Sequence, residues 1–370
     1  MNKIAYLFSL LSLLLFVPSL QAELPTIELR KEVRKSFSAE QGHQLRVVNS
    51  YGNINIQTHS KKIIEFFVEI KVNSSNSSKA KQKLDEVSIS FSEGPNYVKA
   101  ETKIEESKSW WPNFSWGDNN ADMEINYNIK VPERLFLELT QKYGNIYMPN
   151  YIGSANVDVK YGNFEGANLK GAMDLTVKYG NGKMGEVQSI NIDAGYGTVD
   201  LISAQKIDGN IKYGGVNVSN FDEITLQSKY SNYKLGTGKK LNFTGAYDNV
   251  KVRSIDQLAL DNKYADISIQ NFRGRGTLRM DYSKVNIEEF GTGDITLDIT
   301  GKYTTTKIFA TAGYRVDVTG KYMTPVVRGD FTEQSRVERD QHVSLTGLKN
   351  QKPYSALVKI NSSYGNVYLE

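Results

Sequence analysis

The residues with the most regular chemical character are lysines that directly precede a tyrosine. Eight of them recur along the chain: Lys142, Lys160, Lys178, Lys212, Lys229, Lys263, Lys302 and Lys321. Because a row of ammonium groups attracts polyanions, one hypothesis is a low-affinity track for anionic polysaccharide or lipopolysaccharide. Its candidate ligand contacts are Lys160, Lys178, Lys212 and Lys229. The alternative is a solvated face whose like charges keep the protein soluble and discourage association.

All three tryptophans lie close together in one polar segment, which is the sharpest local anomaly in the sequence. With a neighbouring phenylalanine they form the second set of candidate ligand contacts: Trp110, Trp111, Phe114 and Trp116. Such clusters stack on sugars or anchor to surfaces, because indole combines a large apolar area with a hydrogen-bond donor. The same residues could instead form a lid over the first coils, and the sequence leaves both interpretations open.

The sequence shows no recognisable catalytic or metal-binding pattern. His43, His59 and His342 are far apart and have no companion at metal-ligand spacing. The sequence has neither a phosphate-binding glycine loop nor a serine-nucleophile elbow. Aspartates are spread along the repeat instead of concentrated as an acid and base pair: Asp158, Asp174, Asp193, Asp208, Asp261, Asp298 and Asp317. We therefore predict no catalytic, cofactor-binding or metal-binding residues and expect that the protein is not an enzyme.

The elements that position these side chains follow from an internal repeat of about 17 to 18 residues. A tyrosine-centred motif recurs at Tyr143, Tyr161, Tyr179, Tyr196, Tyr213, Tyr230, Tyr247, Tyr264, Tyr282, Tyr303 and Tyr322. The first three copies read Lys-Tyr-Gly-Asn, and outlying Tyr-Gly-Asn copies begin at Tyr51 and Tyr364. A fixed period of this length is typical of stacked repeat architectures.

Apolar and polar residues alternate on both sides of each tyrosine, with a change of phase in between. Ile190 and Ile192 lie at even distances before Tyr196. Val199 and Leu201 follow it at plus three and plus five. An odd step in a period-two pattern needs a corner, which we assign to the Gly-Asn pair. Each coil then has a longer wall, a short wall and a closing corner.

No coil of this kind can bury its inner face alone, so the coils must stack in parallel, about 4.8 Å apart. We predict an all-β, single-stranded parallel β-solenoid (β-helix), right-handed because parallel crossovers favour that sense. The tyrosines share the parity of the core, so we expect a stacked structural ladder inside one corner: Tyr143, Tyr161, Tyr179, Tyr196, Tyr213, Tyr230, Tyr247, Tyr264 and Tyr282. We also expect an amide ladder beside it, at Asn145, Asn163, Asn181, Asn232 and Asn249.

The remaining segments suggest a signal peptide and two distinct ends. Residues 1–22 resemble a cleaved secretory signal, with one lysine before an apolar run from Ile4 to Val17 and the small residue Ala22 at its end. The expected order is then an N-terminal cap with the first coil (23–133), regular coils (134–327), an irregular insertion (328–353) and a final coil at the edge (354–370). The cap should contain one short helix over residues 79–87.

Composition limits the partners. The 45 basic and 41 acidic residues nearly balance, to a formal charge of +4, which argues against a nucleic-acid partner. No segment after the signal peptide is apolar enough for a transmembrane span. We expect an exported protein in the periplasm or at the cell surface, with no cofactor and with polysaccharide or another cell-surface component as its partner.

Four features together resemble the bacterial putative-adhesin family of extracytoplasmic β-solenoids, whose function is largely unassigned. They are the signal peptide, the segment Val47 to Ile54, the segment Ile129 to Pro132 before the first regular coil, and the Tyr-Gly-Asn repeats. The resemblance implies a right-handed β-helix-like fold and an adhesive role, and it supplies no catalytic residues.

The function expected from these observations is a non-catalytic binding scaffold or adhesin that contacts cell-surface glycans. One alternative is a structural protein that self-associates through the ends of its solenoid. A polysaccharide-active enzyme is the less favoured alternative, because it would need two close carboxylates.

Overall fold

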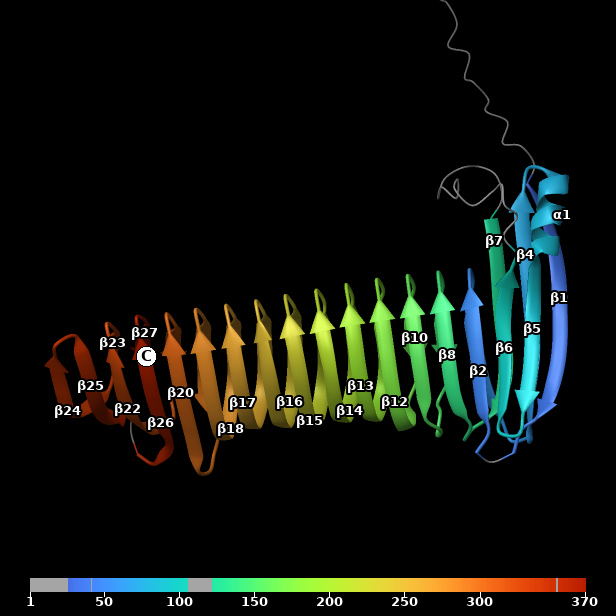
Figure 1. Cartoon of the computed structure of the whole chain (residues 1–370). Helices are drawn as coiled ribbons and strands as arrows, with labels where there is room; N and C mark the ends of the chain where they lie inside the picture. Colours follow the sequence, from blue (N-terminus) through green and yellow to red (C-terminus); the bar gives the residue numbers. More distant parts are fainter. Residues whose placement is uncertain (1–25, 41, 106–121, 351) are drawn as a thin grey trace, which may run out of the picture.

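The computed structural model describes all residues except 1–25, 41, 106–121 and 351. The predicted signal peptide therefore lies outside the described residues. The protein is a rod of parallel coils with antiparallel strands at both ends (Figure 1). Within the described part of the chain, no helix is long and apolar enough to cross a membrane. The predicted all-β parallel solenoid with a single short helix near its N-terminus is confirmed.

Each coil contributes a long wall before its tyrosine and a short wall after it. From β13 to β18 the short wall after one tyrosine and the long wall before the next run together as one bent strand, whereas in the outer coils they are separate strands. The solenoid comprises β2 (Gln44–Ser50), β3 (Ile54–His59), β8 (Phe136–Lys142), β9 (Ile146–Met148), β10 (Ala155–Lys160), β11 (Phe164–Gly166), β12 (Leu169–Lys178), β13 (Gly182–Gly195), β14 (Thr198–Lys212), β15 (Gly215–Lys229), β16 (Asn232–Ala246), β17 (Asn249–Lys263), β18 (Asp266–Asp281), β19 (Lys284–Phe290), β20 (Ile295–Lys302), β21 (Thr305–Ile308), β22 (Gly313–Lys321), β23 (Thr324–Val327), β26 (Tyr354–Ser363) and β27 (Asn366–Leu369).

The core is a set of apolar columns that run along the rod. Val199, Val216, Tyr233, Val250 and Ile267 occupy one register position in successive coils, and all are buried. Because parallel strands lie about 4.8 Å apart, each apolar side chain packs on its equivalents above and below. The stability of the rod therefore comes from contacts between neighbouring coils.

The corner differs from the prediction in the residue that makes it. All thirteen tyrosines of the motif have a left-handed backbone, with φ between 51° and 62°. The conformation turns the chain at the tyrosine itself, so its side chain leaves the period-two pattern and points outward. The tyrosines are roughly half exposed, as Tyr196 is at 53%. The prediction that the ladder lies inside the corner is therefore wrong, because parity does not carry through a left-handed residue.

The glycine after the tyrosine has a steric role. A Cβ on Gly162 would lie 1.9 Å from the Gly144 carbonyl oxygen, and one on Gly180 would lie 1.7 Å from that of Gly162. The backbones of successive turns thus meet with no room for a side chain. The Gly-Asn pair does not make the corner. Its glycine fits the backbone contact in these first coils, whereas later coils stack as closely with Ser231, Asp248 or Ala265 at this position.

The amide ladder exists in the first coils only. The Oδ1 atoms of Asn145 and Asn163 accept hydrogen bonds from the backbone N–H groups of Asn163 and Asn181, at 2.8 and 2.9 Å. The backbone N–H groups of Asn232 and Asn249 donate instead to carbonyls of the preceding coils. The ladder is therefore confirmed at Asn145, Asn163 and Asn181 and is wrong at Asn232 and Asn249.

An antiparallel cap covers the N-terminal end of the rod. Its elements are β1 (Ile27–Ser38), β4 (Ile63–Ser74), α1 (Ser77–Glu86), β5 (Val87–Gly94), β6 (Tyr97–Ile104) and β7 (Asp122–Pro132). The Asn76 side chain caps α1 by accepting a hydrogen bond from the backbone N–H of Lys79 at 3.1 Å. The strands β1 and β4 pair along twelve residues each, and β4 continues the sheet to β7. The expected cap with one short helix is present.

The final coil of the sequence is not the final coil of the rod. Strand β26 lies between β20 and β22, and β27 lies between β21 and β23. The Tyr364 ring accordingly stacks on Tyr303 at 4.9 Å and on Tyr322 at 4.8 Å. The expectation that residues 354–370 form the edge is wrong. The last residues of the chain form a coil that is inserted between the coil of β20 and β21 and the coil of β22 and β23.

A β-hairpin closes the C-terminal end. Strand β25 (His342–Lys349) pairs antiparallel with β22, and β24 (Phe331–Arg339) pairs antiparallel with β25 (Figure 1). Segment 328–353 is thus largely regular, contrary to expectation. Both faces of β24 are mostly exposed, so its sequence lacks the apolar alternation by which strands are recognised.

Candidate binding surface

The tyrosine corner, defined as the thirteen motif tyrosines, is a continuous aromatic strip on the outside of the rod. Neighbouring rings stack with centroids 4.6 to 5.2 Å apart and planes 4° to 19° apart. In spatial order the rings are Tyr51, Tyr143, Tyr161, Tyr179, Tyr196, Tyr213, Tyr230, Tyr247, Tyr264, Tyr282, Tyr303, Tyr364 and Tyr322. At about 4.8 Å a step, the strip extends roughly 60 Å.

Stacking decides which atoms the strip can offer to a ligand. The faces of each inner ring are occupied by the rings on either side, so the exposed half consists of ring edges and the polar end of the side chain. Aromatic edges carry partial positive charge, and a phenol hydroxyl both donates and accepts hydrogen bonds. The tyrosine corner is therefore suited to oxygen-rich ligands and offers few ring faces for sugars to stack on.

A groove follows the short-wall side of the corner. It has a volume of about 740 Å³. Its lining consists of five tyrosines and the polar residue two positions after each of them: Tyr230, Tyr247, Tyr264, Tyr282 and Tyr303, with Asn232, Asn249, Asp266, Lys284 and Thr305. The groove is open and runs along the rod, so it fits an extended chain better than a small enclosed molecule.

The predicted lysine contacts lie on the long-wall side of the corner, and their surroundings differ. Lys160 Nζ pairs with Asp158 at 3.4 Å, and Lys178 Nζ pairs with Asp193 at 2.6 Å. Lys229 Nζ lies 5.3 Å from the centroid of its neighbour's ring, that of Tyr230. Lys212 has no ion pair within the residues the structure describes. Register brings Lys160 beside Lys178 and Lys212 beside Lys229, with Gly195 between the two pairs.

Two of the predicted outward aspartates, Asp158 and Asp193, act as partners of these lysines. Asp281, which was not predicted, pairs with Lys263 at 3.8 Å. Exposed pairs of this kind contribute little to stability, roughly 0 to 1 kcal/mol, but they lower the net positive charge of the stripe. The lysines remain predicted ligand contacts on a partly neutralised face.

A buried acid lies beneath the tyrosine corner. Asp248 directly follows Tyr247 and is only 3% exposed. Its Oδ1 accepts hydrogen bonds from the Ser228 hydroxyl at 2.8 Å and from the Ser231 backbone N–H at 2.9 Å. Its Oδ2 has no hydrogen-bond partner. Burial raises the pKa of this carboxyl, and the donors only partly oppose that effect.

The other predicted sites are either outside the described residues or dispersed. Trp110, Trp111, Phe114 and Trp116 lie within residues 106–121, so whether they form a lid or a ligand contact stays a prediction. In the chain as far as it is described, no cluster of three histidine, cysteine or acidic side chains is placed to hold a metal ion.

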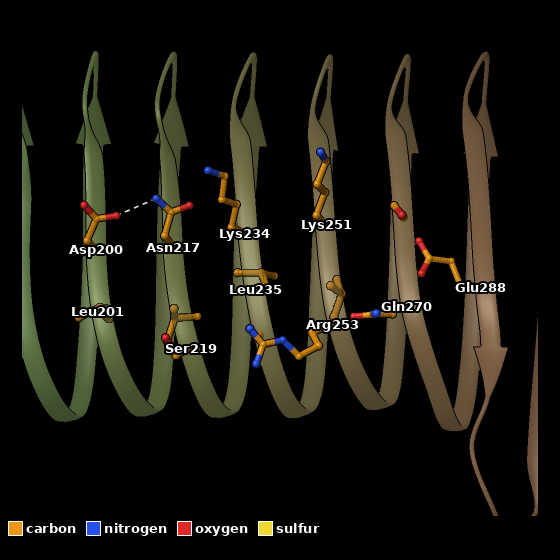
Figure 2. Close-up of a pocket in the computed structure, with 14 residues that line it drawn as sticks. Asp200, Leu201, Asn217, Ser219, Lys234, Leu235, Lys251, Arg253, Gln270 and Glu288 are labelled. Carbon is orange, nitrogen blue, oxygen red and sulfur yellow. Dashed lines mark hydrogen bonds between the residues drawn. The ribbon is translucent and has the colours of Figure 1, made fainter.

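Sequence analysis missed one cluster, on the outer surface of the short wall. Figure 2 shows Lys234, Lys251 and Arg253 there on two adjacent coils, around a hollow of about 510 Å³. The signal was present, since Lys234 and Lys251 both follow their tyrosines by four residues. This signal is weaker than the one before the tyrosine, where lysine recurs in most coils.

Comparisons with known proteins give a resemblance in fold. Neither a protein-family model nor a curated protein matches the chain. Among solved structures it is similar to a putative cell adhesion protein from Clostridium sporogenes (12% identity, 92% of this chain and 99% of that chain, TM-score 0.21). It is also similar to a putative adhesin from Parabacteroides merdae (13%, 76% and 93%, TM-score 0.30) and a putative lipid binding protein from Parabacteroides distasonis (11%, 92% and 96%, TM-score 0.27). Proteins named as adhesins are thus among the structural neighbours of this chain.

Proposed function

We propose that the protein is an exported, non-catalytic binding scaffold that presents the tyrosine corner to cell-surface glycans. The observation that carries this proposal is a tyrosine with positive φ in all thirteen coils. A bulky residue is unfavourable in that region, where glycine and asparagine fit at less cost. The position that follows is not restricted in this way, since it holds Ser231, Asp248 and Ala265 as well as glycine.

Ring stacking partly explains why tyrosine occupies this left-handed position. Each offset pair contributes roughly 0.5 to 1.5 kcal/mol beyond the area it buries, which offsets the backbone strain of roughly 1 to 3 kcal/mol. Most of these tyrosines nevertheless stay largely in contact with water, as in Tyr179 at 51% and Tyr213 at 48% exposure. A purely structural ladder would be more stabilising if it were buried. The exposure therefore supports a role for the outer surface of the ladder itself.

A long periodic surface suits a polymer. A glycan chain lying along the strip would meet one hydroxyl and one ring edge per coil, so many weak contacts add up through effective concentration. The lysines Lys160, Lys178, Lys212 and Lys229 border the strip on its long-wall side, and the groove with Asn232 and Asn249 borders it on the other. The tryptophan cluster remains a further predicted contact.

The ends of the rod favour binding over self-assembly. Four of the described strands pair on one side only. Two of them are rich in charge, with Arg30, Lys31 and Glu32 on β1 and Glu333 and Arg336 on β24, whereas β5 and β23 carry few charges. Charged edge strands discourage pairing with another chain. Assembly through the ends would have to overcome these charges.

A glycan array with three forms of the purified protein tests the proposal. The variant Tyr196→Asn/Tyr213→Asn/Tyr230→Asn keeps residues that tolerate positive φ but removes three adjacent rings and hydroxyls, and we expect at least a tenfold loss of affinity for the glycans retained. Tyr97→Asn, which changes an exposed tyrosine of the cap, is the control and should bind as the parent does. Retention of no glycan by the parent, or equal retention by the triple variant, would contradict the proposal.

A further inference from the structure

The hollow on the short wall combines positive charge with a shape that leaves the charges accessible. Lys234 on β16 and Lys251 on β17 are direct register partners, so their ammonium groups sit on adjacent coils. Arg253 follows two residues after Lys251 on the same strand. All three side chains are exposed. Like charges on neighbouring strands repel one another, and a bound anion would relieve that repulsion.

These cations lack the acidic partners found elsewhere on the same coils. At the closing corner, Lys239 pairs with Asp222, Lys240 with Glu223 and Arg273 with Asp256, each at 2.8 Å. On the short wall, none of the three cations forms an ion pair with any residue the structure describes. The same stretch of the rod therefore has a neutralised corner and an uncompensated wall.

Small residues keep the hollow open. Gly236 has no side chain, and a Cβ there would lie 2.0 Å from the Ser219 carbonyl oxygen. Figure 2 shows the Arg253 side chain reaching across from its own coil toward the coil that carries Leu235 and Gly236. In the same view the Lys234 and Lys251 side chains extend away from the guanidinium group.

Acidic residues appear only at the two ends of this hollow. Asp200 accepts a hydrogen bond from the Asn217 side chain at 2.7 Å and lies three coils from Lys251. Glu288 lies at the opposite end (Figure 2). The positive region is therefore limited to the two central coils, with neutral polar groups such as Ser219 and Gln270 around it.

We infer that this hollow binds the acidic groups of an anionic polysaccharide, whether sulfate, phosphate or carboxylate. A guanidinium group matches such oxyanions with two parallel hydrogen bonds, and the lysines on the same two coils add positive charge. The surrounding amide and hydroxyl groups suit sugar hydroxyls. The near balance of charge over the whole chain does not suit a nucleic acid.

The hollow adjoins the surface already proposed. Lys234 and Lys251 follow Tyr230 and Tyr247 by four residues, and the groove at Asn232 and Asn249 lies between them. A glycan held on the tyrosine corner could therefore place an acidic group in the hollow. The inference rests on the proposed function and names the class of glycan that the surface selects.

Two variants with the same change of charge test the site. Lys234→Gln/Lys251→Gln/Arg253→Gln removes three charges from the hollow, and Lys239→Gln/Lys240→Gln/Arg273→Gln removes three from the closing corner. Binding of dextran sulfate, polygalacturonate, uncharged dextran and oligothymidine is measured by calorimetry over a range of salt concentrations. We expect the hollow variant to bind the two acidic polysaccharides at least tenfold more weakly, with a shallower salt dependence, and the closing-corner variant to change by less than about twofold.

The outcomes separate the inference from the proposed function. Equal weakening by both variants would mean that only net charge matters, which overturns the inference. Unchanged binding by the hollow variant would overturn it and leave the glycan scaffold standing. Tighter binding of oligothymidine than of dextran sulfate would point to a nucleic-acid partner and also overturn it. Failure of the parent to bind any of the three polysaccharides, together with an empty glycan array, would contradict the proposed function itself. Circular dichroism melting confirms that both variants are folded.

Discussion

Tyr179 and Tyr196 stack with ring centroids 4.8 Å apart and planes 5° apart, while their backbones hold φ of 56° and 57°. The two facts have one cause. Because each tyrosine turns the chain in the left-handed region, its ring points away from the core and meets the ring of the next coil in the same orientation. The stacked, exposed strip is thus a direct consequence of a backbone conformation repeated at every coil.

Substitutions at Tyr213 test this link between ring stacking and backbone conformation. Tyr213→Asn removes stacking with two neighbours and keeps a residue that tolerates φ of 55°, so it should lower the free energy of unfolding by about 1 to 2 kcal/mol. Tyr213→Val should cost more, because a β-branched residue disfavours that conformation. Chemical denaturation measures both variants. Equal losses would show that the left-handed backbone places no demand on the side chain.

The end of the strip provides the control for stacking. Tyr322 has one stacked neighbour, Tyr364, whereas Tyr213 has two. Tyr322→Asn should therefore cost about half as much as Tyr213→Asn, roughly 0.5 to 1 kcal/mol. A loss at Tyr322 as large as that at Tyr213 would contradict stacking as the main stabilising term.

Gly180→Ala tests the close approach of the turns. The added Cβ would lie 1.7 Å from the Gly162 carbonyl oxygen, so the two coils must move apart and we expect a loss of about 2 to 4 kcal/mol. Thermal melting followed by circular dichroism measures it. Ala265→Gly changes the equivalent position in a coil that already holds a side chain, and should cost only about 1 kcal/mol. Tolerance of Gly180→Ala without a change in melting temperature would refute the backbone contact.

The buried Asp248 gives stability a dependence on pH. Its pKa is raised in the folded state because burial disfavours the charged form. The folded protein therefore holds this proton more tightly than the unfolded chain. The corresponding stability is fully present below the unfolded pKa, near 3.8, and is lost as the pH rises through the folded pKa.

Asp248→Asn removes this titration. Relative to the parent, we expect the variant to gain stability as the pH is raised from about 4 to about 7, by roughly 1 kcal/mol. Melting temperatures of the two proteins over that range measure the difference between them. A difference that does not vary with pH would show that Asp248 titrates normally.

The insertion of the final coil can be tested with disulfides, because the sequence contains no cysteine. Lys307 and Tyr368 are register partners on β21 and β27, at a spacing of about 4.8 Å that a disulfide can bridge. Lys307→Cys/Tyr368→Cys should crosslink within one chain. Val326 is the register partner of Tyr368 on the other side, so Lys307→Cys/Val326→Cys spans two coils and should not. The reverse result would place residues 354–370 at the edge.

Local pattern was enough to predict the architecture. The spacing of the tyrosines and the alternation around Ile190 and Ile192 identify strands, a corner and a repeat, because they depend only on which side chains of a short segment face the core. The cap helix was predicted within two residues at its start for the same reason. The regularity of the coils also predicted that the tyrosines stack.

The orientation of the tyrosine strip and the order of the coils could not be predicted in this way. The alternation of inward and outward side chains is interrupted at a left-handed residue, and nothing in the sequence around Tyr143 marks it as left-handed. The position of residues 354–370 between β20 and β22 depends on edges that are far away in the chain. The cationic hollow also depends on contacts between coils, since only stacking brings Lys234 beside Lys251.

The sequence by itself therefore determined that this chain winds into a parallel solenoid with a tyrosine in every coil, because period and polarity are properties of the local chain. The tertiary structure alone decided which side of the wall those tyrosines face, which coil lies beside which, and where positive charge is left without an acidic partner. Those features arise from backbone conformation and from register between strands, and both are fixed only when the coils pack on one another.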